Sequence, residues 1–86
     1  MTHLARFFEN AFTRNNHLSR YVLAPWSIVF VDRIGYVYFE IFYHNLRIAS
    51  GNTADKELTL LSDDHVLVQK TVEDFIFALP DYKVKT

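Results

Sequence analysis

The sequence predicts an α+β domain with an N-terminal helix, an antiparallel sheet of three to four strands and a short C-terminal helix. Three patterns predict this class. Apolar residues recur at helical spacing near the N-terminus, two β-branched and aromatic runs occupy residues 26–43, and a second helical pattern lies near the C-terminus. Because the chain has 86 residues, we expect one domain, residues 1–86, with a small core.

The first helix is predicted to begin at His3, because the hydroxyl of Thr2 suits the N-cap position. Two asparagines at 15–16 favour a break, since Asn tolerates left-handed backbone. Residues 17–23 are expected to add a turn or two of helix with Leu18 and Val22 inward, ended by Pro25. The inward positions of the first helix are Leu4, Phe7, Phe8, Ala11 and Phe12.

Residues 26–43 predict a β-hairpin, because apolar residues alternate along two runs joined by Asp32-Arg33-Ile34-Gly35. We expect a positive φ at Gly35, a backbone conformation that a β-branched residue tolerates badly. The second run has two faces. One carries Val37, Phe39, Ile41 and Tyr43, and the other carries Tyr36, Tyr38, Glu40, Phe42 and His44.

Beyond the hairpin, residues 46–49 either continue the second strand through a bulge or begin a third strand after a turn. Residues 50–55 have loop composition, and residues 57–61 predict a strand with Leu58 and Leu60 inward.

Residues 62–65 allow two interpretations, a turn leading to a strand over 65–70 or the start of a helix capped by Ser62. We favour the turn, because Thr71 with an acid three residues later suits a capping box. That helix would face Val72, Phe75, Ile76 and Leu79 inward and end at Pro80, leaving residues 81–86 as a tail on which Tyr82 contacts the core.

Composition and motifs favour a protein without catalytic activity. The formal charge is −1, and Cys is absent, so thiolate metal sites and disulfides are excluded. The sequence has no nucleophile elbow or glycine-rich phosphate loop, and no two His residues have helical metal-site spacing. Asp63-Asp64-His65 is better interpreted as a polar turn than as a metal site. We therefore expect no enzyme, cofactor or metal, no membrane segment, and a cytoplasmic location.

The mostly aromatic second face of the hairpin is the candidate binding site. A strand in a two-layer protein should be polar on one side, so this face needs a cover. Either the two helices lie on opposite faces of the sheet, or a protein partner or second copy covers the aromatic face. The candidate partner-binding residues are Arg33, Tyr36, Tyr38, Glu40 and Phe42.

In size and order of elements the chain resembles small phage-encoded inhibitors, the anti-CRISPR proteins among them. The helix over residues 4–12, the hairpin over residues 26–43 and the closing helix after Thr71 carry this resemblance. It implies a non-catalytic protein, in the host cytoplasm, that blocks a host defence nuclease complex by occupying a protein surface or by stabilising an inactive state.

Two alternatives to a protein inhibitor remain. Residues 33–41 are similar to the aromatic strand of RNA-recognition motifs, although Ile34 stands before the glycine where that family has a basic residue. That similarity implies a single-stranded nucleic-acid-binding module using Tyr36, Tyr38 and Arg33. The near-neutral charge disfavours nucleic acid. A structural subunit of a homo-oligomer, such as a homodimer, is the third interpretation.

Overall fold

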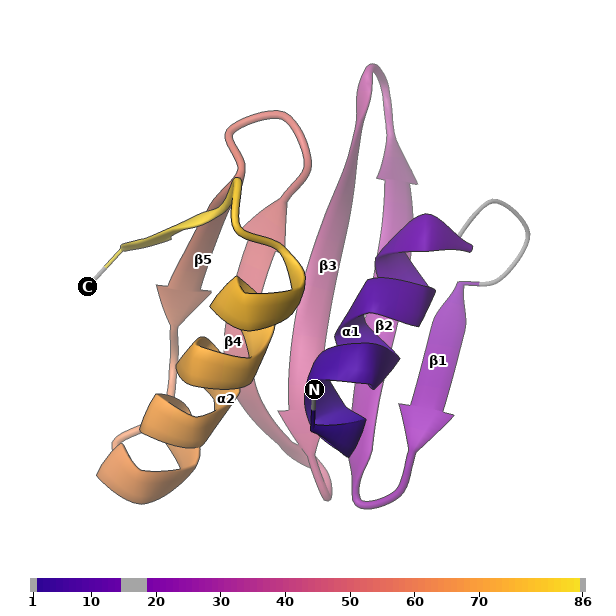
Figure 1. Cartoon of the computed structure of the whole chain (residues 1–86). Helices are drawn as coiled ribbons and strands as arrows, with labels where there is room; N and C mark the ends of the chain where they lie inside the picture. Colours follow the sequence, from indigo (N-terminus) through magenta and orange to yellow (C-terminus); the bar gives the residue numbers. More distant parts are fainter. Residues whose placement is uncertain (1, 15–18, 86) are drawn as a thin grey trace.

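The structure, a computed structural model, describes residues 2–14 and 19–85 and has α+β architecture (Figure 1). An N-terminal helix and a C-terminal helix flank a run of strands, as predicted, but the sheet has six strands and not three to four. The elements are α1 (His3–Thr13), β1 (Arg20–Leu23), β2 (Trp26–Arg33), β3 (Tyr36–Tyr43), β4 (Leu46–Asn52), β5 (Glu57–Leu60), α2 (His65–Ala78) and β6 (Lys83–Lys85).

The six strands lie side by side in the order of the sequence. β1 to β5 form an antiparallel meander, and β6 pairs in parallel with β5, so the sheet is mixed. Short turns suffice for the meander, whereas the parallel pair needs the crossover that α2 supplies. The additional strands come from two segments, 20–23 and 83–85, that the sequence predicted as helix and tail.

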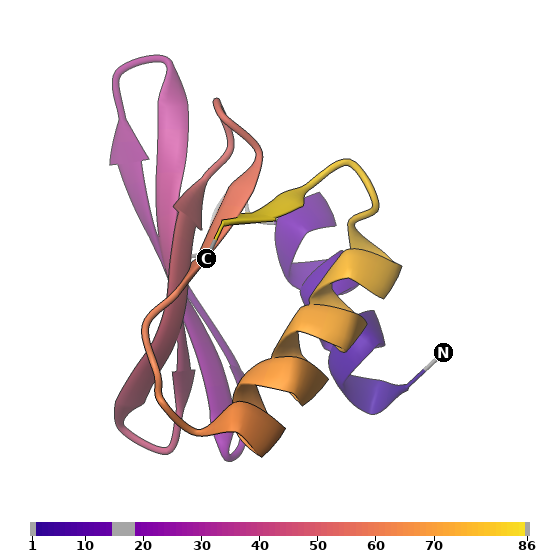
Figure 2. The same cartoon turned by 90° about the vertical axis from the view of Figure 1, so that its left-hand side faces the viewer.

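Both helices pack on the same face of the sheet, so the molecule has two layers (Figure 2). The Phe8 ring on α1 meets the Phe75 ring on α2 edge to face, with centroids 5.4 Å apart. Of the two alternatives for covering the aromatic face, the one in which the helices lie on opposite faces of the sheet is therefore wrong. A chain of 86 residues has too little apolar surface to build two separate cores, which favours one shared layer.

Aromatic rings form the centre of the core between the helices and the sheet. Phe39 on β3 is fully buried and stacks against Phe75 at a centroid distance of 5.9 Å. Phe12 on α1 meets four rings edge to face, a geometry that adds to the gain from burial. Those four rings belong to Phe30, Phe39, Phe75 and Tyr82.

The start of α1 is as predicted. The Thr2 hydroxyl accepts a hydrogen bond from the Ala5 amide at 3.0 Å and caps the helix. The next expectation is wrong, because Arg20–Leu23 forms β1 and not a helical turn, and Val22 is 62% exposed. Pairing with β2 satisfies the backbone of β1, so tertiary context overrides the helical spacing. The predicted break at 15–16 and the inward placement of Leu18 lie outside the described residues.

The hairpin of β2 and β3 is confirmed, with Gly35 at φ +82°. Its turn is one residue later than predicted, because Arg33 still pairs with Tyr36. The chain turns again at residues 44–45 and begins β4, so His44 lies in a turn and not on the strand. β4 continues to Asn52, which shortens the predicted loop over 50–55 to residues 53–56.

Residues 65–70 form the first half of α2 and not a strand, so the favoured interpretation of this segment is wrong. Asp64 is the N-cap, and its carboxylate accepts from the Leu67 amide at 3.0 Å. Neither Ser62 nor Thr71 caps the helix. Thr71 is buried in its middle, where its hydroxyl donates to the Leu67 carbonyl at 2.7 Å.

The C-terminal segment is a strand and not a free tail. Lys83 N–H donates to the Lys56 carbonyl at 2.8 Å, and Val84 pairs with Leu58. Tyr82 is buried, as expected, and the Lys56 ammonium lies 5.2 Å from the centre of its ring. Burial raises the pKa of the Tyr82 phenol, and the nearby Asp81 charge adds to that rise.

Candidate binding surface on the open face of the sheet

The sheet has a second face that neither helix covers, and we call it the open face (Figure 2). Because side chains alternate along a strand, every second residue of β1 to β4 contributes to it. Its members on these strands are Arg20, Val22, Ser27, Val29, Val31, Arg33, Tyr36, Tyr38, Glu40, Phe42, Arg47, Ser50 and Asn52. The structure thus brings all five candidate residues named from the sequence to one surface.

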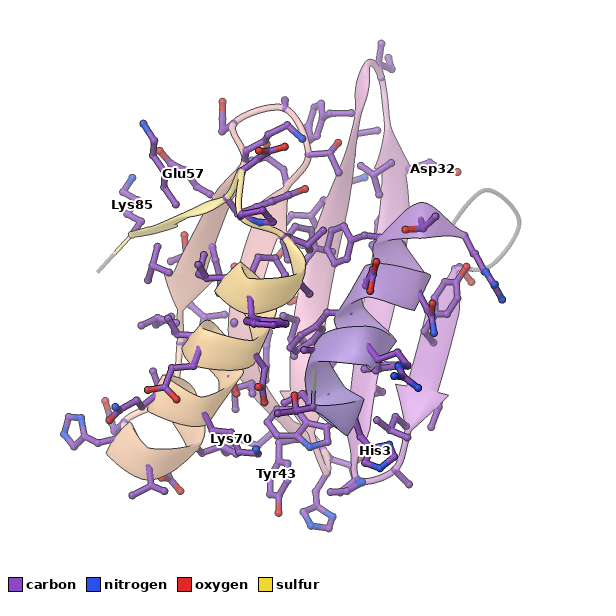
Figure 3. The ribbon with its side chains drawn as sticks, viewed as in Figure 1. His3, Asp32, Tyr43, Glu57, Lys70 and Lys85 are labelled. Atoms are coloured by element: carbon purple, nitrogen blue, oxygen red, sulfur yellow. The ribbon has the colours of Figure 1, made fainter. Side chains whose placement is uncertain are left out.

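Three aromatic side chains follow β3 along the centre of the open face. Tyr36 lies beside Arg33 and is 39% exposed, whereas Tyr38 and Phe42 are half-buried by neighbouring strands alone. The row runs between the two ends of the hairpin, marked in Figure 3 by Asp32 and Tyr43. Tyr36 and Phe42 are six residue steps apart along the strand, a distance of roughly 20 Å.

A β-bulge decides which residues of β4 reach the open face. Ile41 pairs with Ala49, but the next residue, Phe42, pairs with Arg47, so Ile48 is the extra residue. Both Ile48 and Ala49 are buried. Regular pairing would place Arg47 on the covered face, because a shift of one residue reverses every side chain. The bulge therefore adds a cation to the open face.

Arg47 and Glu40 form an ion pair on this surface. An Arg47 guanidinium nitrogen lies 2.7 Å from a Glu40 carboxylate oxygen and donates a hydrogen bond to it. That hydrogen bond, followed by attraction to the Glu40 charge, raises the pKa of Arg47. The only carboxylate of the open face on β1 to β4 is thus engaged by a neighbour within the same surface.

Two further arginines, Arg20 and Arg33, stand at the margins of the aromatic row and are exposed. Within the described residues, neither guanidinium has a carboxylate within 4.0 Å. Sequence reasoning missed Arg20 because residues 17–23 were assigned to a helix. It missed Arg47 because the bulge has no clear sequence signal, although Arg47 lies inside the apolar alternation of residues 46–49.

The Phe42 end of the open face is hollowed. A depression of about 170 Å³ lies against Phe42, with Arg20 and His44 on its border. Ser27, Val29 and Asn45 complete its lining. An aromatic residue, a cation and an imidazole that border a shallow hollow can hold a side chain of a binding partner, but the hollow is too small for a drug-sized ligand.

The helix side offers a less promising surface. A depression of about 380 Å³ lies between the helices and is lined by Thr2, Glu73, Asp74 and Phe77. Thr2 donates to one oxygen of buried Asp74 at 2.8 Å, and the Lys70 ammonium lies 3.4 Å from the other oxygen. These contacts connect the cap of α1 to α2, so the Asp74 carboxylate has a structural role.

Metal-ligating side chains are scattered over the part of the chain that the structure describes. Across residues 2–14 and 19–85, no three His, Cys, Asp or Glu side chains gather as a metal site requires. Asp63 and His65 are exposed on either side of the cap residue Asp64. Among the described residues, neither helix has the length and hydrophobicity that a membrane-spanning segment requires.

No match is found when the chain is compared with known protein families, with curated proteins and with solved structures.

Proposed function

We propose that this chain is a small non-catalytic protein-binding module whose binding surface is the open face. One observation carries the proposal: a row of aromatic side chains lies on the one face of the sheet that both helices leave uncovered. An exposed apolar patch rimmed by polar residues is typical of an interaction site in a soluble protein.

The composition of the open face supports a protein partner. Tyr36, Tyr38 and Phe42 form an aromatic centre, with Val29 and Val31 beside them. Each aromatic ring can bury about 150–250 Å², and Tyr and Arg are enriched at interface positions that carry most of the binding energy. Arg33 supplies such a cation next to Tyr36.

The resemblance in size and element order to phage-encoded inhibitors gives this proposal its specific form. Under it, the chain blocks a host defence nuclease complex by occupying a protein surface of that complex, in the host cytoplasm. The protein would then need no active site of its own. An assay for inhibition adds the purified chain to purified CRISPR effector complexes and measures target DNA cleavage.

Substitution of Tyr38 on the open face tests the proposal. Wild-type chain and the Tyr38→Ala variant serve as baits in the source cell, with Phe77→Ala as a control on the exposed side of α2. We expect Tyr38→Ala to weaken binding of a captured and purified partner by about 1–2 kcal/mol or more, as for an interface anchor. Phe77→Ala should bind like wild type.

Equal binding by wild type and Tyr38→Ala, or loss of binding in Phe77→Ala alone, would contradict the proposal. Cleavage assays add a separate answer. If the chain binds through the open face but leaves every effector complex active, the binding module stands and the inhibitor is rejected.

A single-stranded nucleic-acid-binding module is the second candidate, and the arginines of the open face favour it. Aromatic rings next to Arg20 and Arg33 on an uncovered sheet are an arrangement on which bases can stack. Fluorescence anisotropy with a labelled oligothymidylate tests it. Binding that weakens steeply with added salt, and that Tyr38→Ala removes, would support nucleic acid.

A further inference from the structure

We propose that the partner of the open face is an acidic protein segment, one in which carboxylates flank apolar side chains. This inference rests on the proposed function and specifies the chemistry of its partner. The supporting observation is that charge is unevenly distributed over the chain, although its net charge is small.

The charges of the chain are divided between its surfaces. On β1 to β4 the open face has three arginines and one carboxylate, Glu40, which leaves +2. On β5 and β6 the register adds Glu57, Lys83 and Lys85 to the same face, which brings it to +3. Because the whole chain has a formal charge of −1, the rest of the chain carries −4. A surface of one sign selects partners of the opposite sign and repels others.

The arginines are arranged so that two of them remain available to a partner. Arg47 is engaged by Glu40 at 2.7 Å, whereas Arg20 and Arg33 have no carboxylate within 4.0 Å in the described residues. Arg20 is opposite Val29, and Arg33 is four residues further along β2, so roughly 13 Å of strand separates their positions. An extended segment of four to five residues spans about that distance.

The apolar centre of the open face determines which side chains the middle of the bound segment must carry. Val31 and Tyr38 lie between the levels of the two arginines and, with Val29 at the level of Arg20, offer apolar surface. A purely polar acidic chain would leave this surface wet. Apolar side chains in the middle of the segment, with carboxylates at its ends, would match both features.

Charge also argues against two other occupants. A second copy of the chain stacked on the open face would set a positively charged surface against an identical one, and like charges across an interface are costly. A nucleic acid strand crossing the aromatic row would bring its phosphates close to the Glu40–Arg47 ion pair, whose two charges cancel and offer no net attraction. A protein segment can place its carboxylates at the margins and avoid Glu40.

The test titrates ¹⁵N-labelled chain with defined probes and records amide shifts by NMR. The main probe is a peptide of about 12 residues, long enough to cross the aromatic row in extended form. Every second residue is Leu in its centre and Glu toward both ends, with Ser between them, so that the Leu and Glu side chains lie on one face of the extended peptide. Matched peptides replace Glu by Lys or Leu by Ser, and a dT12 oligonucleotide represents nucleic acid.

We expect the Glu–Leu peptide to shift amides of β1 to β3 and to bind less tightly as salt is raised. The Glu–Ser peptide should bind about tenfold more weakly, and the Lys–Leu peptide should not bind. The double variant Arg20→Glu/Arg33→Glu should weaken Glu–Leu binding about tenfold or more. Its control is Arg6→Glu/Arg14→Glu, which makes the same charge change at exposed positions on the helix side.

Several outcomes would overturn the inference. They are absence of Glu–Leu binding, shifts confined to the helices, equal effects of the two double variants, and tighter binding of dT12 than of the Glu–Leu peptide. Shifts on the open face that grow with protein concentration alone would indicate a second copy. If the peptide experiment fails but capture of a partner still depends on Tyr38, the acidic-segment inference is rejected and the proposed protein-binding function stands. The two proposals can therefore fail separately.

Discussion

Phe39 and Tyr38 are neighbours on β3, yet they lie in opposite environments. Phe39 is fully buried among rings from both helices, while Tyr38 has only the side chains of the sheet around it. Both faces of β3 carry aromatic side chains, so the presence of aromatic residues does not explain the difference. The covered face holds the fold together, and the open face is available for binding. Substitutions that separate these two roles test the account.

The largest effect is expected inside the covered face. Phe75→Ala removes a fully buried ring that contacts Phe8, Phe12 and Phe39, and should lower the free energy of unfolding by about 3–5 kcal/mol. Phe77→Ala, two residues later and 62% exposed, should cost under about 1 kcal/mol. Urea denaturation measures the loss of unfolding free energy in both variants. Similar losses would show that α2 is rotated about its axis, so that Phe75 does not face the core alone.

The next effect concerns Gly51, which has no room for a side chain. A Cβ there would lie 2.2 Å from the Glu57 carbonyl oxygen and 2.7 Å from the Phe39 ring. Gly51→Ala should therefore destabilise the chain by about 1–3 kcal/mol or more through overpacking. Ser50→Ala, on the open face, should change stability by no more than about 0.5 kcal/mol. A neutral Gly51→Ala in thermal melts would mean that β4 lies further from β3 and β5.

A smaller effect locates the start of α2, the helix that covers β4 and β5. Asp64→Ala removes the N-cap hydrogen bond to Leu67 and should cost about 1 kcal/mol. Ser62→Ala removes only a 3.2 Å contact to the Asp64 amide and should cost less. Chemical denaturation of both variants ranks the losses, and the reverse order would place the cap at Ser62.

These cases show which parts of the fold the sequence could predict. The hairpin of β2 and β3 was predictable because its alternation and the Gly35 turn are local signals. The start of α2 was not, because Asp64 and Thr71 both suit a cap and only packing decides between them. Two edge strands, β1 and β6, were missed because short segments adopt strand geometry when a neighbour offers backbone partners.

The candidate site was also predicted only in part, because some of its features follow from local spacing and others from tertiary packing. Period-2 spacing alone placed Tyr36, Tyr38, Glu40 and Phe42 on one face. Whether that face was covered depended on where the helices pack, which is a tertiary property. The contribution of Arg47 depended on a bulge of one residue, and that of Arg20 on recognising β1.

The smallest effect is a dependence of stability on alkaline pH. The pKa of Tyr82 is raised by burial and by Asp81, so the fold favours the neutral phenol. Below about pH 10, the usual pKa of Tyr, this contribution is fully present, and it is lost as pH rises through the raised value. Tyr82→Phe should lose less stability than wild type in melts across that window. Parallel pH curves would contradict the assignment.

The central claim is that the two faces of β3 have different roles, and paired melts of Tyr38→Ala and Phe39→Ala with light scattering test it most directly. We predict that Phe39→Ala loses about 3–5 kcal/mol of stability. Tyr38→Ala, measured as a monomer, should lose about 1 kcal/mol or less, because no helix packs on it. A monomeric Tyr38→Ala variant that is destabilised as much as Phe39→Ala would show that Tyr38 belongs to the core and would contradict the open face as a binding surface.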